Sequence, residues 1–214
     1  MITLQDLNNS YRSKNKFIKN RLKEFENILN NSDDKKLFEE MVFCILTAGT
    51  SAKLCLDVIK QVREIIHTGS KDEITAKLKG CYRFYNIRAD YIFITREYLK
   101  DEFQMKIKEM LLSFEDPVER RDFLAQNKRV KGLGYKESSH FLRNIGFKGY
   151  AILDKHIIRT LFECGVIKDS KIPGSRANYI EIENRLKEFA TKNGFDIDEL
   201  DLLLWSEKTG TILK

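Results

Sequence analysis

An amine and a carboxylate stand out in the stretch VKGLGYKESSHFLRNIGFKGYAILDKH, which runs from Val130 to His156. Lys136 lies at the expected start of a helix, where the helix dipole opposes its positive charge and favours the neutral amine, which is a nucleophile. Asp154 follows a short apolar run and takes the N-cap position of the next expected helix. Such a pair suits chemistry at a sugar C1′. The carboxylate stabilises positive charge on the sugar as a base departs, and the amine forms a Schiff base that permits β-elimination.

Both residues also have a purely structural interpretation. Lys136 is compatible with a solvent-facing lysine that merely touches a phosphate. Asp154 is compatible with a simple helix cap, and capping does not conflict with catalysis because the cap holds the carboxylate in place.

The two glycines before the lysine, Gly132 and Gly134, are the second feature of this stretch. A residue without a Cβ lets the backbone turn tightly and approach another chain closely, while Leu133 between them is expected to point inward. The first turn of the following helix offers free N–H groups and a positive dipole end, which together bind phosphate. This pattern predicts a helix-hairpin-helix that grips a DNA backbone, with Lys131 beside the glycines. Gly-x-Gly is also common in an ordinary connector between helices.

The elements that must position these groups are helices, because apolar residues recur at helical spacing along nearly the whole chain and alternating runs are almost absent. Asp116 and Pro117 mark a helix start, and MVFCILTA is apolar all round, which predicts a buried central helix. The fold class is therefore expected to be all-α. The expected helices span 15–30, 35–48, 52–67, 72–79, 83–99, 103–113, 117–128, 136–145, 155–164, 177–192 and 196–208.

The spacing permits the lysine and the aspartate to meet. Helix 136–145 carries the chain roughly 15 Å away, and residues 146–153 can span up to ~26 Å when extended. We expect residues 1–214 to form one unit of two helical lobes with the helix-hairpin-helix, about 117–146, at the cleft between them. The central lobe is built around helix 35–48, and the aspartate loop covers about 147–156.

Composition narrows the class of partner. The chain of 214 residues has 38 Lys plus Arg against 32 Asp plus Glu, a net charge of +6, and a pI near 9.0, which favours a polyanion. The N-terminus lacks a signal peptide's apolar core and no apolar stretch is long enough for a membrane, so a cytoplasmic protein is expected. The four cysteines form no CxxC pair, which argues against zinc and iron–sulfur sites. Cys44 and Cys55 are expected to be small residues of the core.

At this point the sequence resembles a known family. VKGLGYKESSHFLRNIGF followed by AILDKHI resembles the helix-hairpin-helix and catalytic aspartate of the DNA glycosylase superfamily that includes endonuclease III. Within it, the stretch is most similar to the archaeal-type (type 2) 8-oxoguanine DNA glycosylase/AP lyases. FCILTAGTSA, YRFYNIRADYI and ELDLLLWSEKTGTILK resemble the core helix and loop, the next helix pair and the C-terminus of that family, so the likeness covers most of the chain.

The resemblance implies a role for each matching position. Lys136 would be the Schiff-base nucleophile, and Asp154 the carboxylate that activates it and stabilises the oxocarbenium ion. A damaged guanine flipped out of double-stranded DNA would stack between Phe84 and Trp205, and the terminal carboxylate of Lys214 would contact it. No cofactor is required, although backbone carbonyls of Lys131 and Leu133 would hold a structural K⁺ or Na⁺. The enzyme would act as a monomer.

Two alternative functions are also compatible with the sequence. The same fold could act on an oxidised pyrimidine, a mismatched adenine or an alkylated base, although many oxidised-pyrimidine and adenine enzymes carry a four-cysteine iron–sulfur cluster that this sequence lacks. A non-catalytic DNA-binding module would use the hairpin only to grip phosphate, and would need neither Asp154 nor the pocket aromatics.

Overall fold

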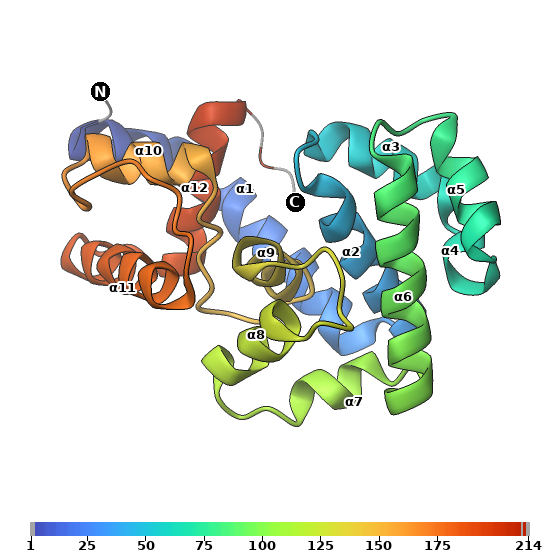
Figure 1. Cartoon of the computed structure of the whole chain (residues 1–214). Helices are drawn as coiled ribbons and strands as arrows, with labels where there is room; N and C mark the ends of the chain where they lie inside the picture. Colours follow the sequence, from blue (N-terminus) through green and yellow to red (C-terminus); the bar gives the residue numbers. More distant parts are fainter. Residues whose placement is uncertain (1–2, 211, 213–214) are drawn as a thin grey trace. The chain divides into compact units, whose positions relative to one another are not determined.

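The computed structural model describes residues 3–210 and residue 212, and in that part of the chain the regular elements are all helices (Figure 1). The predicted all-α class is therefore confirmed. The helices are α1 (Leu4–Asn31), α2 (Asp34–Thr47), α3 (Ala52–Val62), α4 (Ile65–Thr68), α5 (Lys71–Lys79), α6 (Tyr85–Phe103), α7 (Ile107–Leu112), α8 (Pro117–Gln126), α9 (Tyr135–Asn144), α10 (Lys155–Glu163), α11 (Arg176–Lys192) and α12 (Ile197–Thr209).

The chain divides into two compact units, one of residues 28–141 and one of residues 1–27 with 142–214. In the unit 28–141, α2 packs against α3, α6 and α7, and its residues from Leu37 to Thr47 are all buried. A helix that is apolar on every side is stable only when neighbours cover every side, which is why MVFCILTA forms the centre of this unit. The predicted central helix is confirmed, and Cys44 and Cys55 are buried there as small core residues.

The unit of residues 1–27 and 142–214 has its core where α10 and α11 pack on α12, together with the buried residues Ile18 and Phe25 of α1. Gly146 allows the chain to pass close to α1: its φ is +104°, and a Cβ added there would lie 2.7 Å from the Phe25 carbonyl oxygen. Arg143, almost fully buried, stacks over the Phe25 ring at 5.1 Å.

Three of the expected helix limits are wrong. α1 begins at Leu4 rather than near residue 15, and within it Ile18 is buried whereas the neighbouring Phe17 is 66% exposed. The expected helix 52–67 breaks after Val62 into α3 and α4. The helix expected from residue 83 runs on to Phe103, where Gln104 and Met105 adopt left-handed backbone angles and separate it from α7.

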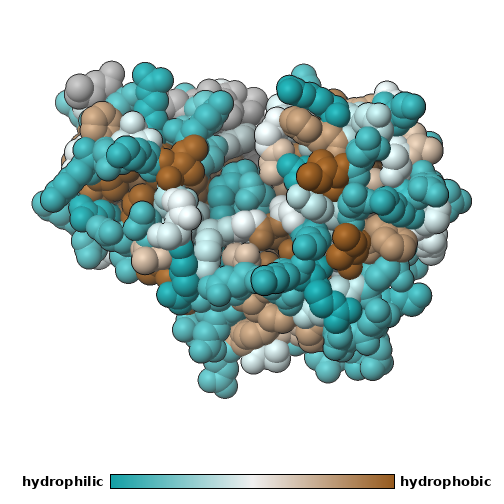
Figure 2. Space-filling view, viewed as in Figure 1, coloured by the Kyte–Doolittle hydropathy of each residue, from teal (hydrophilic) through white to brown (hydrophobic). Residues whose placement is uncertain are grey.

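Helix starts follow the sequence more closely. Asp33, Ser51 and Asp116 each accept a hydrogen bond from a backbone N–H in the first turn of the helix they precede, and Pro117 takes the first helical position of α8. The visible surface is mostly hydrophilic with separate hydrophobic patches (Figure 2). Over the residues that the structure describes, no helix combines the length and apolar character required to span a membrane.

Candidate active site

The hairpin between α8 and α9 packs against side chains of α6. Gly132 has a φ of +80°, and a Cβ added there would lie 2.7 Å from the ring of Tyr91 and 3.1 Å from Ile45. The buried hydroxyl of Thr95 accepts a hydrogen bond from the Lys131 N–H at 2.8 Å and faces the Lys131 carbonyl at 3.5 Å. The side chains of α6 therefore fix the backbone of the predicted DNA-binding hairpin, and only glycine fits where the two elements touch.

The remainder of the hairpin leads directly to the predicted nucleophile. Leu133 is buried, as expected, whereas Gly134 is exposed. α9 begins at Tyr135, so Lys136 lies in the first turn of the helix, where backbone N–H groups have no intrahelical acceptor. Its side chain is 26% exposed, and its Nζ lies 3.6 Å from the Glu137 carboxylate.

Lys136 shares its surroundings with Arg88 and the thiol of Cys55. Burial raises the pKa of the Cys55 thiol to about 12, and the positive charges of Lys136 and Arg88 act in the opposite direction. Both cations are therefore close enough to this thiol to affect it electrostatically. Arg88 is itself fixed, since its guanidinium donates to the Ala48 carbonyl at 2.9 Å and stacks over Tyr91 at 5.4 Å.

Phe84, a predicted base-stacking residue, lies at the start of α6 beside the loop that follows α2. It is half-buried, and a Cβ added to Gly49 of that loop would lie 3.5 Å from the Phe84 ring. The Arg83 guanidinium covers the ring at 4.8 Å. The neighbouring Tyr82 donates a hydrogen bond to the Leu46 carbonyl and accepts one from Thr50. The structure thus places Phe84, the loop 48–52 and Lys136 in one unit.

Asp154, the predicted catalytic carboxylate, lies in the other unit at the start of α10. Its Oδ1 accepts hydrogen bonds from the N–H groups of His156 and Ile157, both at 2.8 Å, so the predicted N-cap is confirmed. The side chain is half-buried. An anion is favoured in this position by the helix dipole as well as by the two donors.

The backbone that leads to Asp154, from Tyr150 to Leu153, is buried and belongs to no helix, with no strand beside it in the described chain. Four N–H groups between Gly149 and Leu153 donate instead to side chains of α11 and α12, which we call the acceptor set: Asp198, Glu183, Asp201 and Tyr179. Gly149 donates to Asp198 at 3.0 Å, Ala151 to Glu183 at 2.9 Å, Ile152 to Asp201 at 2.9 Å and Leu153 to the Tyr179 hydroxyl at 3.2 Å. The same hydroxyl donates to the Ala151 carbonyl at 2.7 Å.

Two members of the acceptor set have strongly altered acidity. Burial raises the pKa of Asp198 to about 7 and that of Asp201 to about 6. Arg143, 3.8 Å from Asp201, opposes both shifts, whereas the charge of Asp154 adds to that of Asp201. Asp154 and Asp201 are therefore near enough to interact electrostatically.

The remaining predicted pocket residues belong to the C-terminal part of the chain. Trp205 lies half-buried on α12, one helical turn beyond Asp201, so the two side chains project from the same side of the helix. Lys214 lies outside the described residues.

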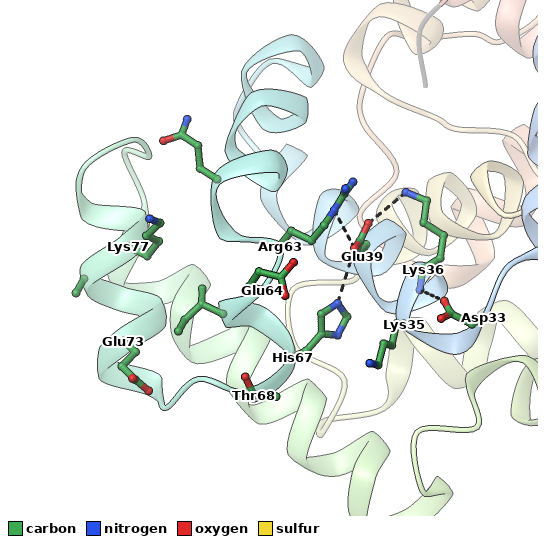
Figure 3. A pocket seen from close by; sticks show the side chains of 13 residues that line it. Asp33, Lys35, Lys36, Glu39, Arg63, Glu64, His67, Thr68, Glu73 and Lys77 are labelled. Atoms are coloured by element: carbon green, nitrogen blue, oxygen red, sulfur yellow. Dashed lines mark hydrogen bonds and ion pairs between the residues drawn. The ribbon is translucent and has the colours of Figure 1, made fainter.

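A pocket of about 990 Å³ on the unit 28–141 is lined by none of the predicted site residues. Its walls come from α2, the α3–α4 region and α5, and Figure 3 shows Arg63, His67 and Lys36 turned toward the Glu39 carboxylate. The three cationic or titratable groups lie 3.0, 3.8 and 3.3 Å from that carboxylate. The charges here thus compensate one another within the protein.

Comparison with known proteins identifies the family. The family model described as 8-oxoguanine DNA glycosylase (Ogg-HhH) matches residues 18–195. The 8-oxoguanine DNA glycosylase/AP lyase of Methanocaldococcus jannaschii is 39% identical over 198 residues, which cover 92% of this chain and 91% of that protein. The protein of the same name from Korarchaeum cryptofilum is 40% identical, covering 92% and 90%. The chain belongs to the 8-oxoguanine DNA glycosylase family.

Solved structures of this glycosylase family agree in fold. The M. jannaschii 8-oxoguanine glycosylase/lyase in complex with a 15mer DNA containing 8-oxoguanine matches with a TM-score of 0.90 and 36% identity, covering 99% of both chains. The 8-oxoguanine DNA glycosylase of Thermotoga maritima, Tm1821, matches with a TM-score of 0.88 and 31% identity, covering 99% of this chain and 98% of that one. The predicted family is therefore confirmed.

Sequence reasoning within this glycosylase family missed the groups that hold the site in place. Thr95 and the acceptor set were not predicted, although one signal was present. Asp198 and Asp201 are three residues apart in FDIDELDLLLW, and both lie on the buried side of the helix together with leucines. Buried carboxylates at helical spacing require donors, and a neighbouring extended segment supplies them.

Proposed function

We propose that this protein excises 8-oxoguanine from double-stranded DNA and then cleaves the strand at the resulting abasic site. The observation that carries the proposal is the position of Lys136, accessible in the first turn of α9 directly behind a glycine hairpin that α6 holds in place. The choice of 8-oxoguanine is supported by the names of the relatives and by the lesion-containing 15mer bound to the M. jannaschii protein.

The hairpin is the proposed DNA grip. Backbone N–H groups at the start of α9 bind a phosphate, with Gly132 and Gly134 allowing close approach and Lys131 adding positive charge. Such contacts fix the position of the enzyme on the duplex without reading its sequence. The base must then leave the stack to reach the catalytic groups.

Chemistry at C1′ then needs one nucleophile and one anion. The C1′–N9 bond breaks with its electron pair on the base, which takes up a proton, while Asp154 stabilises the positive charge left on the sugar. The neutral amine of Lys136 bonds to C1′ and opens the sugar to a Schiff base. Loss of a proton from C2′ expels the 3′ phosphate by β-elimination, and water releases the lysine.

The flipped base is proposed to stack between Phe84 and Trp205 and to meet the carboxylate of Lys214. Aromatic rings suit this task because every base offers a π-face and stacking excludes water. Phe84 is held by Arg83 and by the loop after α2, which gives it a fixed orientation.

A monovalent cation is proposed at the hairpin, and no cofactor is required. The carbonyl oxygens of Lys131 and Leu133 are hard ligands that suit K⁺ or Na⁺, and the Lys131 carbonyl meets the Thr95 hydroxyl only at the long distance of 3.5 Å. The cation would stiffen the hairpin. The enzyme is proposed to act as a monomer on chromosomal DNA, hence at the nucleoid in the cytoplasm.

Borohydride trapping tests the mechanism. On a duplex with one 8-oxoguanine opposite cytosine, the wild-type protein should form a covalent complex that borohydride makes permanent, whereas Lys136→Gln should bind the duplex and form none. A trapped complex with Lys136→Gln would refute the nucleophile. A wild-type protein that binds the duplex yet never excises or traps would be a non-catalytic DNA-binding module instead. Trapping on oxidised pyrimidine or mismatched adenine, but not on 8-oxoguanine, would show that the enzyme acts on a lesion other than 8-oxoguanine.

A further inference from the structure

The segment from Gly149 to Leu153 presents an unusual problem of hydrogen bonding. From Tyr150 onward it is buried and lies outside any helix, so its N–H groups are cut off from water and need acceptors. A strand normally finds them on a neighbouring strand, but here helices α11 and α12 lie beside the segment that leads into α10 (Figure 1). The acceptors are therefore side chains, and each N–H bond depends on one particular residue.

These acceptors are costly groups to place in a core. Asp201 is 1% exposed, Glu183 and Tyr179 are 2% exposed, and removing a carboxylate from water carries a large penalty. Part of this penalty is offset by Arg143, 3.8 Å from Asp201, and by Lys187, 3.5 Å from Glu183. A core of apolar side chains would avoid this desolvation penalty. The presence of the carboxylates therefore indicates that the backbone geometry imposed by their hydrogen bonds matters for function.

The residues immediately before Asp154 each donate one of these hydrogen bonds. Ile152 and Leu153 donate to Asp201 and Tyr179, and the Asp154 N–H donates back to the Ile152 carbonyl at 2.8 Å. With the Ala151 bond to Glu183, all three residues before the carboxylate are hydrogen-bonded to α11 or α12, and the carboxylate itself is bonded to the first turn of α10. A shift of Asp201 or Tyr179 would move the backbone that carries the Asp154 side chain.

We propose that Tyr179 and Asp201 are positioning residues that set the orientation of the Asp154 carboxylate through the backbone of Ile152 and Leu153. The inference rests on the proposed role of Asp154 in base excision. Neither residue touches the reacting atoms. Displacing a catalytic group by about 1 Å costs on the order of 100-fold in rate, so supports of this kind are needed for activity and not only for folding.

The test uses the whole protein and variants that remove one bond. Tyr179→Phe removes only a hydroxyl, and Asp201→Ala removes the acceptor for Ile152, whereas Asp201→Asn keeps an oxygen there. Tyr11→Phe is the matched control, since the Tyr11 hydroxyl bonds Glu199 of α12 and not the segment before Asp154. Each is measured for single-turnover excision at saturating enzyme, for Kd on an uncleavable duplex, and for urea unfolding.

We expect Tyr179→Phe and Asp201→Ala to lower excision by about 10- to 100-fold with unchanged Kd, and Asp201→Asn to restore most of the rate. In an Asp154→Asn protein neither change should lower the rate further, because there is no catalytic carboxylate left to misplace. Should Asp201→Ala fail to fold, Tyr179→Phe, which loses one oxygen atom, carries the test.

Three outcomes would overturn the inference: excision by Tyr179→Phe equal to that of Tyr11→Phe, a rate loss explained by weaker DNA binding, or defects that multiply with that of Asp154→Asn. Full excision by Asp154→Asn would overturn the proposed function as well. A normal Tyr179→Phe beside an inactive Asp154→Asn would refute the positioning role alone.

Discussion

The starts of α9 and α10 carry the two groups proposed to do the chemistry, and they are built in opposite ways. α10 begins with Asp154, whose charge is favoured by the dipole and by two N–H donors. α9 follows Gly134, which has no side chain to cap it, and carries Lys136 in its first turn. The carboxylate therefore stabilises its own helix, whereas the amine contributes no cap to the helix that carries it.

The supports behind the two helix starts differ as well. The hairpin before α9 is fixed by close contact, with the Tyr91 ring against a glycine that has no room for a Cβ. The segment before α10 is fixed by hydrogen bonds to the acceptor set. The hairpin depends mainly on close packing, with one side-chain hydrogen bond from Thr95, whereas the segment before α10 depends on several buried polar groups. Different substitutions should therefore impair the two.

The largest effect is expected at Asp154, where capping and catalysis can be separated. Asn is as good an N-cap as Asp but has no charge, so Asp154→Asn should keep the unfolding free energy near that of the wild type while excision falls by about 10²- to 10³-fold. Asp154→Ala should lose the same activity and also about 1 kcal/mol of stability. Single-turnover excision and urea unfolding of the three proteins measure this, and equal excision by Asp154→Asn and the wild type would leave the residue a cap only.

Gly132→Ala should impair the other helix start by steric contact. A left-handed backbone costs a residue with a Cβ about 1–2 kcal/mol, and forcing the Tyr91 ring aside adds about 1–3 kcal/mol. We expect a lower urea midpoint and weaker binding to undamaged duplex, because the displaced hairpin no longer presents its N–H groups to phosphate. Gly149→Ala, at a φ of +83° but in open space, is the control for strain without crowding. Equal losses in the two variants would argue against the Tyr91 contact.

The buried carboxylates of the acceptor set should make the free energy of unfolding depend on pH, whereas the contacts of the hairpin should not. The pKa of Asp201 is about 6 in the fold against 3.8 ordinarily, so between these pH values the folded protein holds a proton that the unfolded chain has lost. Stability contributed by this group therefore falls as pH rises from about 4 to about 6 and then levels off. Burial is the main cause, Arg143 acts against it, and Asp154 and Glu183 add to it.

Asp201→Asn cannot titrate, so it isolates this contribution. Relative to the wild type, the variant should gain unfolding free energy as pH rises from about 4.5 to about 7, measured by urea unfolding followed by circular dichroism. Asp198 has a pKa of about 7, so Asp198→Asn should show the same gain extending to higher pH. A difference between Asp201→Asn and the wild type that stays constant with pH would show that Asp201 is charged throughout this range.

The two groups proposed to do the chemistry could be named from the sequence because their signals are local. Lys136 after GLG and Asp154 before an apolar helix are visible in a few neighbouring residues, as is the all-apolar run of α2. The supports come from residues far along the chain: Thr95 lies on α6, and Glu183 and Asp201 lie on helices after the site. Periodicity assigns such residues to a helix face but does not say which N–H group they meet.

The errors at helix limits have the same physical origin. α6 continues to Phe103 and then turns through two residues with left-handed angles, neither of which is glycine or asparagine, so no turn residue marks the site. α1 extends to Leu4 through a polar stretch that carries little apolar periodicity, and Leu7 is its first buried contact. Tertiary packing decides both, and local propensity is too weak to show it.

The smallest effect is expected at Thr95, which tests whether hydrogen bonds as well as shape hold the hairpin. Thr95→Val keeps the buried volume but leaves the Lys131 N–H without its acceptor, a loss of about 1–3 kcal/mol in unfolding free energy. We expect Kd for duplex DNA to rise severalfold, because the hairpin gains freedom that binding must remove. Thr95→Ser keeps the hydroxyl and is the control. If Thr95→Val binds DNA as tightly as the wild type while Thr95→Ser binds more weakly, packing of the methyl group and not the hydrogen bond is responsible, and the hairpin is then held by shape alone, in full contrast to the segment before Asp154.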